Sequence, residues 1–308
     1  MKTGKQPPFR LLTPEFSNTT MPTYREYNAR LASMGGMRRV TSTMKMVAAS
    51  HLYRAHTDLK KSAPYGRELA SLLLDVQQPE FRAHRLMAEP LQTHNGLLIV
   101  VTSNRGLCGA FNANVVRAAK RWTDAERNRF RILRAAYIGR KGQLGLRKEL
   151  EMRGDAPLAM PAHPVPVEAL RIARPICQDF LEGRYDEVHL VFNRYVSPMV
   201  SHTEVERLLP IRLPPRPAGS RAVTPQILEP GGERLLEQIL LQWIDFRVYE
   251  AMLHSVACEH AARVVAMENA TTNLRRLESE LTLLRNRARQ AAITKELAEI
   301  VGGAEALA

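Results

Sequence analysis

Two long stretches of the chain carry apolar residues three or four positions apart. The first runs from Thr23 to Ala63 and contains no proline. Its apolar positions are Leu31, Met34, Met37, Val40, Met44, Val47, Ala55 and Leu59. This spacing predicts one helix of about 40 residues, or roughly 60 Å. Pro64 is expected to break or kink the helix, and Tyr65–Val76 can continue it.

The second stretch lies between Gly232 and Gly302 and contains neither proline nor glycine. It predicts a helix too long for a globular domain to bury along its length. Its later part repeats apolar residues in a pattern of seven, at Leu274, Leu277, Leu281, Leu284, Ala288 and Ala291. A sustained repeat of this kind needs a partner helix. Because the only other long helix expected is the N-terminal one, we predict an antiparallel coiled coil of the two chain ends.

Strands and helices alternate between these two stretches. Residues 96–102 form a continuous apolar run, which is typical of a strand buried on both faces. Further strands are expected over 131–138, 187–195 and 200–209, and helices over 113–122, 139–151 and 166–181. This alternation predicts a small, mainly parallel α/β domain inserted between the long helices. The prolines of residues 210–232, followed by glycines, indicate a linker.

Four parts of the chain follow from these patterns. Residues 1–21 are expected to be a flexible N-terminal extension, and 22–78 the N-terminal coiled-coil helix. Residues 79–232 are expected to be the α/β domain with its proline-rich linker, and 233–308 the C-terminal coiled-coil helix.

The chain of 308 residues carries a formal net charge of +13. The excess is concentrated near the N terminus, whereas the C-terminal helix is slightly acidic, which favours their association. Such a charge also predicts a negatively charged neighbour: nucleic acid, an anionic membrane or an acidic protein surface. No apolar run is long enough to span a membrane, and the first twenty residues lack the apolar stretch of a secretory signal. Three widely separated cysteines predict neither a disulfide framework nor a zinc site, so we expect a reduced, soluble, intracellular protein.

Catalytic and cofactor-binding motifs are missing from the sequence. There is no G-x-G-x-x-G, no G-x-x-x-x-G-K-[ST], no G-x-S-x-G and no H-E-x-x-H, and no two histidines are four residues apart. We therefore predict no catalytic site, no cofactor and no metal. Residues 103–106 follow a strand and precede a helix, where phosphate could bind. Glycines in such turns more often only shape the backbone, and we favour that role here and for residues 139–142.

The basic N-terminal helix and its two glycines each leave alternatives open. A nucleic-acid surface needs stacking aromatics among its basic residues, and only four tyrosines are available, so we favour a solvated face or an acidic protein partner. A nucleic-acid-binding coiled coil remains the alternative function. Gly35-Gly36 costs about 2 kcal/mol relative to alanine. Either the backbone packs closely against a bulky neighbour there, or the pair makes a compliant point in the coil.

Several segments together resemble the gamma subunit of F-type ATP synthases, the central rotor shaft of that enzyme. They are MKMVAAS at 44–50, NRGLCGAFN at 104–112, NRARQAAITKEL at 286–297 and EIVGGA at 299–304. The likeness runs from about Pro22 to the C terminus. It departs from the family at Gly35-Gly36 and Arg38-Arg39, where longer polar side chains are usual. Because it starts at Met21-Pro22, we expect Met21 to be the initiator or residues 1–20 to be a disordered extension.

The resemblance implies a fold like the one expected above, with a Rossmann-like domain that binds no dinucleotide. It implies a non-catalytic subunit that couples ion flow through the membrane c-ring to conformational cycling of the catalytic β subunits. The implied partners are the α and β subunits, the epsilon subunit and the c-ring, with no nucleic acid and no direct membrane insertion. The implied location is peripheral, on the cytoplasmic side of a bacterial-type coupling membrane.

The resemblance also implies contact residues, position by position. Arg289, Gln290 and Thr294 match residues that touch a β-subunit loop. Met44 matches a shaft methionine near the lever of the β subunit. The strand over 200–211 matches the strand near the foot. Val200, Thr203 and Glu204 are therefore expected to contact the c-ring or the epsilon subunit.

Overall fold

A computed structural model of the chain describes residues 23–76, 84–90, 92–154, 156–212 and 232–305. The helices are α1 (Tyr24–Val76), α2 (Phe111–Glu126), α3 (Arg140–Leu146), α4 (Pro166–Leu181) and α5 (Gly232–Glu305). The strands are β1 (Asn95–Val101), β2 (Ile132–Ile138), β3 (Glu151–Met152), β4 (Glu187–Ser197) and β5 (Val200–Leu209). The predicted extension 1–21, the 78/79 boundary and most of the proline-rich linker lie outside the described residues.

The strands form one five-stranded sheet in the order β3-β2-β1-β4-β5. β1 pairs in parallel with both β2 and β4, β3 pairs in parallel with β2, and β5 is antiparallel to β4. The prediction of an inserted, mainly parallel α/β domain is therefore confirmed. The two-residue strand β3 was not predicted, because two residues are too few to show a period.

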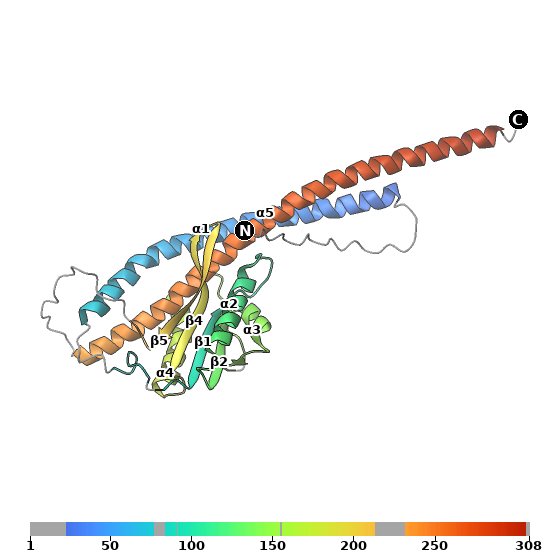
Figure 1. Ribbon diagram of the computed structural model, residues 1–308. Coiled ribbons are helices and arrows are strands. Elements are labelled where there is room, and N and C mark those ends of the chain that lie inside the picture. Colours follow the sequence, from blue (N-terminus) through green and yellow to red (C-terminus); the bar gives the residue numbers. More distant parts are fainter. Residues whose placement is uncertain (1–22, 77–83, 91, 155, 213–231, 306–308) are drawn as a thin grey trace, which may run out of the picture. The chain divides into compact units, whose positions relative to one another are not determined.

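β1 is buried on both faces, as its continuous apolar run predicts. Leu98 and Val100 pack with α2 and α3 on one face of the sheet. Leu97 and Ile99 pack with α4 and the two long helices on the other. Each such side chain contributes about 1.5–3 kcal/mol when fully buried. The sheet therefore holds the long helices against one side of the domain (Figure 1).

α1 continues through Pro64 to Val76, so the expected break does not occur, whereas a kink at this proline stays a prediction. Pro64 is exposed, and the carbonyl group that it leaves without a helical partner can be hydrated. Beyond it, Leu69 and Leu73 are 3% and 0% exposed within the main hydrophobic core. Packing of these two leucines outweighs the lost helical hydrogen bond.

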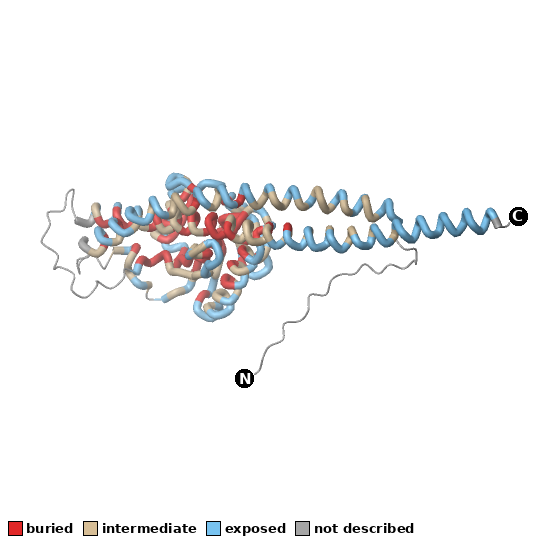
Figure 2. Tube along the Cα trace, turned by 90° about the horizontal axis from the view of Figure 1, so that it is seen from above, coloured by how far each residue is buried: buried red, intermediate tan, exposed pale blue. Residues whose placement is uncertain are grey.

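Close contacts divide the chain into two units. One is Val40–Thr271, which holds the sheet, α2–α4 and the adjoining parts of both long helices. The other combines residues up to Arg39 with Thr272–Ala308. Buried residues gather in the first unit, whereas the helical segments of the second are exposed or half-buried (Figure 2).

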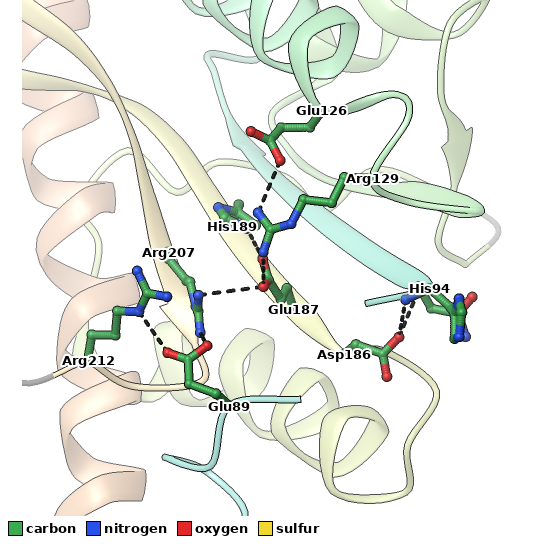
Figure 3. Close-up of polar contacts among 10 residues, drawn as sticks. Glu89, His94, Glu126, Arg129, Asp186, Glu187, His189, Arg207 and Arg212 are labelled. Carbon is green, nitrogen blue, oxygen red and sulfur yellow. Dashed lines mark hydrogen bonds and ion pairs between the residues drawn. The ribbon is translucent and has the colours of Figure 1, made fainter. Parts of the chain in front are cut away.

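The buried carboxylate of Glu187 links β4 to β5 at the start of β4 (Figure 3). Glu187, at the start of β4, is 1% exposed and forms ion pairs with Arg129 and Arg207. Its other oxygen lies 2.9 Å from His189 Nε2. Arg207 of β5 also pairs with Glu89, so the network extends from the α2–β2 connection to the segment before β1. Because a buried charge is tolerated only when paired, this network holds β5 in its register.

Candidate functional site

The two long helices pack side by side in antiparallel orientation within the unit Val40–Thr271. Thr41 Oγ1 and Thr271 Oγ1 are 2.9 Å apart, and one turn further along Lys45 forms an ion pair with Glu268. Ala48 is 1% exposed, and its small side chain lets the helices approach closely. The prediction that the two chain ends pair as antiparallel helices is confirmed.

The pairing also exists within the unit that combines residues up to Arg39 with Thr272–Ala308. Arg38 Nε lies 3.1 Å from a carboxylate oxygen of Glu278. Of the predicted heptad positions, Leu274, Leu281 and Ala288 are half-buried. Leu277 and Leu284 are 37% and 41% exposed, because two helices cover only one stripe of each other's surface.

The C-terminal end of α5 exposes a row of apolar residues. Ile293, Leu297, Ile300 and Val301 are 45%, 57%, 68% and 57% exposed. We call these four residues the distal stripe. Their spacing places them on one face of the helix, and no described residue covers that face. An apolar face of this kind on a helix marks a surface for a partner.

The predicted β-contact residues on α5 are all exposed. Thr294 Oγ1 donates to the backbone oxygen of Gln290 at 2.9 Å, so these two side chains share a face. That face continues through Leu297 and Val301, because the steps are four, three and four residues. Arg289 is exposed beside it. Gln290 and Thr294 therefore extend the distal stripe toward the paired region.

Met44, the remaining predicted β contact, belongs to the other unit. It is half-buried and lines a cavity of about 540 Å³. The walls of this cavity come from α1, α5, the loop 104–107 and the segment 160–162. The four predicted contacts are thus not brought together in one unit.

The residues predicted to contact the foot lie on the β4–β5 hairpin. Val200 begins β5 and is 44% exposed next to Met199, which is 80% exposed. Thr203 Oγ1 donates to Asn193 Oδ1 at 2.6 Å. Glu204 accepts from Arg194 Nε at 2.6 Å. The side chains of Thr203 and Glu204 are thus bound within the hairpin, whereas the apolar side chain of Val200 is exposed.

A ladder of charges that we did not predict joins this hairpin to α5. Arg194 of β4 pairs with Glu204 and Glu206 of β5, and Glu206 also pairs with Arg247 of α5. The two glutamates are two residues apart, so they project from the same face of the strand. The spacing of these two glutamates is visible in the sequence, but it does not indicate which basic residues they bind.

The turn after β1 is occupied by the chain's own contacts. Asn104 Nδ2 donates to the backbone oxygen of Met160 at 2.7 Å, and Met160 N donates back to Asn104 Oδ1 at 3.0 Å. The backbone oxygen of Gly106 accepts from Arg263. At Gly139, where φ is +96°, a side chain would collide with the Thr102 carbonyl oxygen. These observations favour the backbone-shaping role of both glycine turns over phosphate binding.

The described residues contain little that could carry out covalent chemistry. Burial raises the pKa of the Cys177 and Cys258 thiols to about 12, so neither forms a thiolate near neutral pH. No group of three histidine, cysteine or acidic side chains among the described residues is arranged to hold a metal ion. None of the described helices is long and apolar enough to cross a membrane.

Comparison with known proteins identifies the family of this chain. The sequence profile described as ATP synthase matches residues 23–307. The ATP synthase gamma chain of Anaeromyxobacter sp. (strain Fw109-5) is 39% identical over 292 residues, covering 93% of this chain and 100% of the relative. That of Geobacter metallireducens is 35% identical over 287 residues, covering 93% and 99%.

Solved structures show the same fold. The Tetrahymena thermophila mitochondrial ATP synthase, central stalk and c-ring, contains a chain with a TM-score of 0.56 and 24% identity, covering 75% of this chain and 99% of that one. A chain of the Euglena gracilis mitochondrial enzyme has a TM-score of 0.58 and 21% identity, covering 92% and 94%. From the profile and the full-length relatives, this chain belongs to the ATP synthase gamma chain family, whose members are non-catalytic subunits of ATP synthase.

Proposed function

We propose that this chain couples ion flow to ATP turnover by rotating with its distal stripe inside the ring of α and β subunits. The observation that carries the proposal is the exposed apolar face formed by Ile293, Leu297, Ile300 and Val301. The family assignment says which enzyme the subunit serves, and the stripe indicates which end of it is enclosed by partners.

An apolar tip suits a part that must turn inside its partners. Apolar contact is non-directional, so rotation exchanges one set of contacts for another of similar energy. A row of hydrogen bonds would instead be broken at every step. The end of α5 is asymmetric, because the distal stripe lies on one face of the helix and Lys295 and Glu299 lie on the opposite face. An asymmetric rod contacts three equivalent sites differently, and only differential contact can shift their conformations.

Arg289, Gln290 and Thr294 are the proposed contacts with a β-subunit loop. They are exposed, and two of them share the face of the distal stripe. Met44 is the proposed contact on α1. Its side chain borders a cavity, so it can shift against a moving neighbour without distorting a closely packed core.

The turn of the β4–β5 hairpin is the proposed contact with the epsilon subunit or the c-ring. Val196, Met199 and Val200 form an exposed apolar turn there. Thr203 and Glu204 are bound within the hairpin, and we propose that they support its shape beside the contact. Cysteine placed at Val200 should cross-link to epsilon or a c subunit in assembled enzyme. Reaction with neither would refute this assignment.

We place the subunit on the cytoplasmic side of a bacterial coupling membrane. The bacterial origin of the full-length relatives supports this location. The protein should sediment with membranes that contain assembled enzyme and be released when the α and β subunits are stripped off. Its remaining in the supernatant of intact membranes would contradict the assignment.

Reconstitution with the cognate α and β subunits tests the central proposal. The chain alone should hydrolyse no ATP, and mixing should restore hydrolysis. Ile300→Glu should impair assembly or hydrolysis, because it places a charge in an apolar contact. Ile300→Leu is the matched control and should behave like the unchanged protein. Full activity of Ile300→Glu would refute enclosure of the distal stripe.

The alternative function, nucleic-acid binding, makes a different prediction for the same preparation. The isolated chain would bind DNA or RNA tightly, and the affinity would fall steeply with salt. The rotor function requires no such binding. Tight, salt-dependent binding together with failed reconstitution would favour the alternative.

A further inference from the structure

Three histidine rings from three separate segments meet within the unit Val40–Thr271. His51 lies on α1, His260 on α5 and His163 in the segment between β3 and α4. The rings of His51 and His260 are stacked, with centroids 4.9 Å apart. The rings of His51 and His163 have centroids 5.3 Å apart. His51 is therefore the central member, and it connects both long helices to a loop of the α/β domain.

The charged groups around this cluster are mostly positive. Arg54 on α1 and Arg263 on α5 both act electrostatically on His51, and Arg105 lines the adjoining cavity. The carboxylate that faces the cluster, Glu259, is bound to Arg263 at 2.6 Å. Glu259 is the one acidic residue among the described residues that line the adjoining cavity, and its carboxylate is paired with Arg263.

Neutral imidazoles are favoured in this environment. Burial, then the neighbouring His163 and the arginines, lower the pKa of His51. Burial, then Arg263 and the other two histidines, lower the pKa of His260 to about 4. His51 Nδ1 is buried without a hydrogen-bond partner among the described residues. Adding protons would place like charges about 5 Å apart with no free carboxylate beside them.

Away from the three rings, residues 160–162 border a cavity and not a closely packed surface. Pro161 and Ala162, next to His163, line the cavity of about 540 Å³ together with Met44 and Val47. The backbone of Met160 is held to Asn104, which anchors one end of this segment. Beside the cavity, the contact of the His163 ring with His51 therefore attaches residues 161–163 to α1.

We infer that the stacked rings of His51 and His260, with the His163 ring packed on His51, form a pH-sensitive latch, which holds residues 161–163 against α1 and α5 and releases them when His51 and His260 take up protons. This inference stands on the geometry of the α/β domain and its helices and does not depend on the rotor function. In the assembled enzyme, release would loosen the attachment of the domain to the helices as the surrounding pH falls.

The direction of the effect follows from the lowered pKa values. The unfolded or released histidines bind protons near their ordinary pKa of about 6.5. In the latch, His51 and His260 bind protons only at lower pH. The latch is therefore fully closed above about pH 6.5 and weakens as the pH falls from there toward about 4.

Hydrogen exchange of the full chain tests the latch. Protection is compared at about pH 7.5 and about pH 5, after correction for the intrinsic exchange rate, with the α2 peptide as internal reference. Peptides covering 43–51 and 156–165 should lose protection about tenfold or more at the lower pH, since one unit of pKa shift corresponds to tenfold. Unchanged protection at both pH values would overturn the inference.

Two variants separate the latch from general acid sensitivity. His163 is exposed, so His163→Ala should fold normally, and it should have weaker protection of 156–165 at pH 7.5 with little further loss at pH 5. His51→Gln/His260→Gln should likewise lose the pH response. His56→Gln is the matched control, because His56 lies on α1 but contacts Tyr195 instead. A full pH response in both latch variants, equal to that of the control, would refute the assignment.

Discussion

Replacing Gly35 and Gly36 together by alanine is expected to stabilise the N-terminal part of α1. A Cβ atom built at Gly36 meets no atom within 4 Å, and at Gly35 the nearest is Glu278 Oε1 at 3.9 Å, an ordinary contact. The explanation that these glycines allow close backbone packing is therefore wrong. Each exchange should contribute about 1 kcal/mol from helix propensity, or about 2 kcal/mol for the pair.

Gly66→Ala is the matched control on the same helix, and its effect should have the opposite sign. A Cβ at Gly66 would overlap Cε1 and Cζ of Phe246 on α5, whose ring is 6% exposed. Relieving such an overlap in a packed core costs about 1–3 kcal/mol, which outweighs the gain in propensity.

Amide exchange of residues 24–39 in the isolated chain measures the first effect, and urea denaturation measures the second. The double variant should exchange up to roughly thirty-fold more slowly, which corresponds to about 2 kcal/mol. Gly66→Ala should lower the unfolding midpoint. Faster exchange in the double variant would refute the reasoning, because it would mean that these positions need glycine. Altered coupling in the reconstituted enzyme despite the added stability would identify the pair as the compliant point.

Three further results are expected. Glu187→Gln should destabilise the chain by about 2–4 kcal/mol in urea, because it removes the buried carboxylate charge that Arg129 and Arg207 share and leaves Arg207 only the exposed Glu89. Glu126→Gln, at the more exposed end of the same network, should cost under about 0.5 kcal/mol, and equal losses would contradict this account. The free energy of unfolding should fall between about pH 6.5 and 4, because burial and then two arginines lower the pKa of His254 to about 4. If His254→Gln shows the same dependence of the unfolding free energy on pH, His254 is excluded as its source. Truncation after Arg285 should weaken copurification with the α and β subunits without shifting the near-ultraviolet spectrum of the α/β domain, and a lost spectrum would count against the domain's independence.

The secondary structure was predictable where one physical requirement dominates. The run at 96–102 can only be apolar throughout if both faces are covered, and β1 is indeed covered on both. The absence of proline and glycine over 233–301 permits one continuous helix, and α5 runs from Gly232 to Glu305. Pro64 shows the limit of this reasoning, because tertiary packing of Leu69 and Leu73 decides the outcome there.

The contacts of individual side chains were less accessible from sequence. Glu204 was expected from the family resemblance to be a contact residue, and its carboxylate binds Arg194 on the neighbouring strand. The histidine cluster joins residues more than two hundred positions apart, at 51 and 260, with a third ring from a loop. Spacing along one element detects neither arrangement, because both depend on how separate elements are packed together.

If partners enclose the distal stripe as proposed, the stripe favours assembly without being needed for the stability of the free chain. Its four side chains are about half exposed, so they contribute little to the stability of the free chain. Complete burial would add on the order of 1 kcal/mol for each, or roughly 4–5 kcal/mol in total. That energy is available only to partners that enclose the end of α5. The folding of the α/β domain relies instead on the separate core around β1, so assembly and folding draw on different apolar residues.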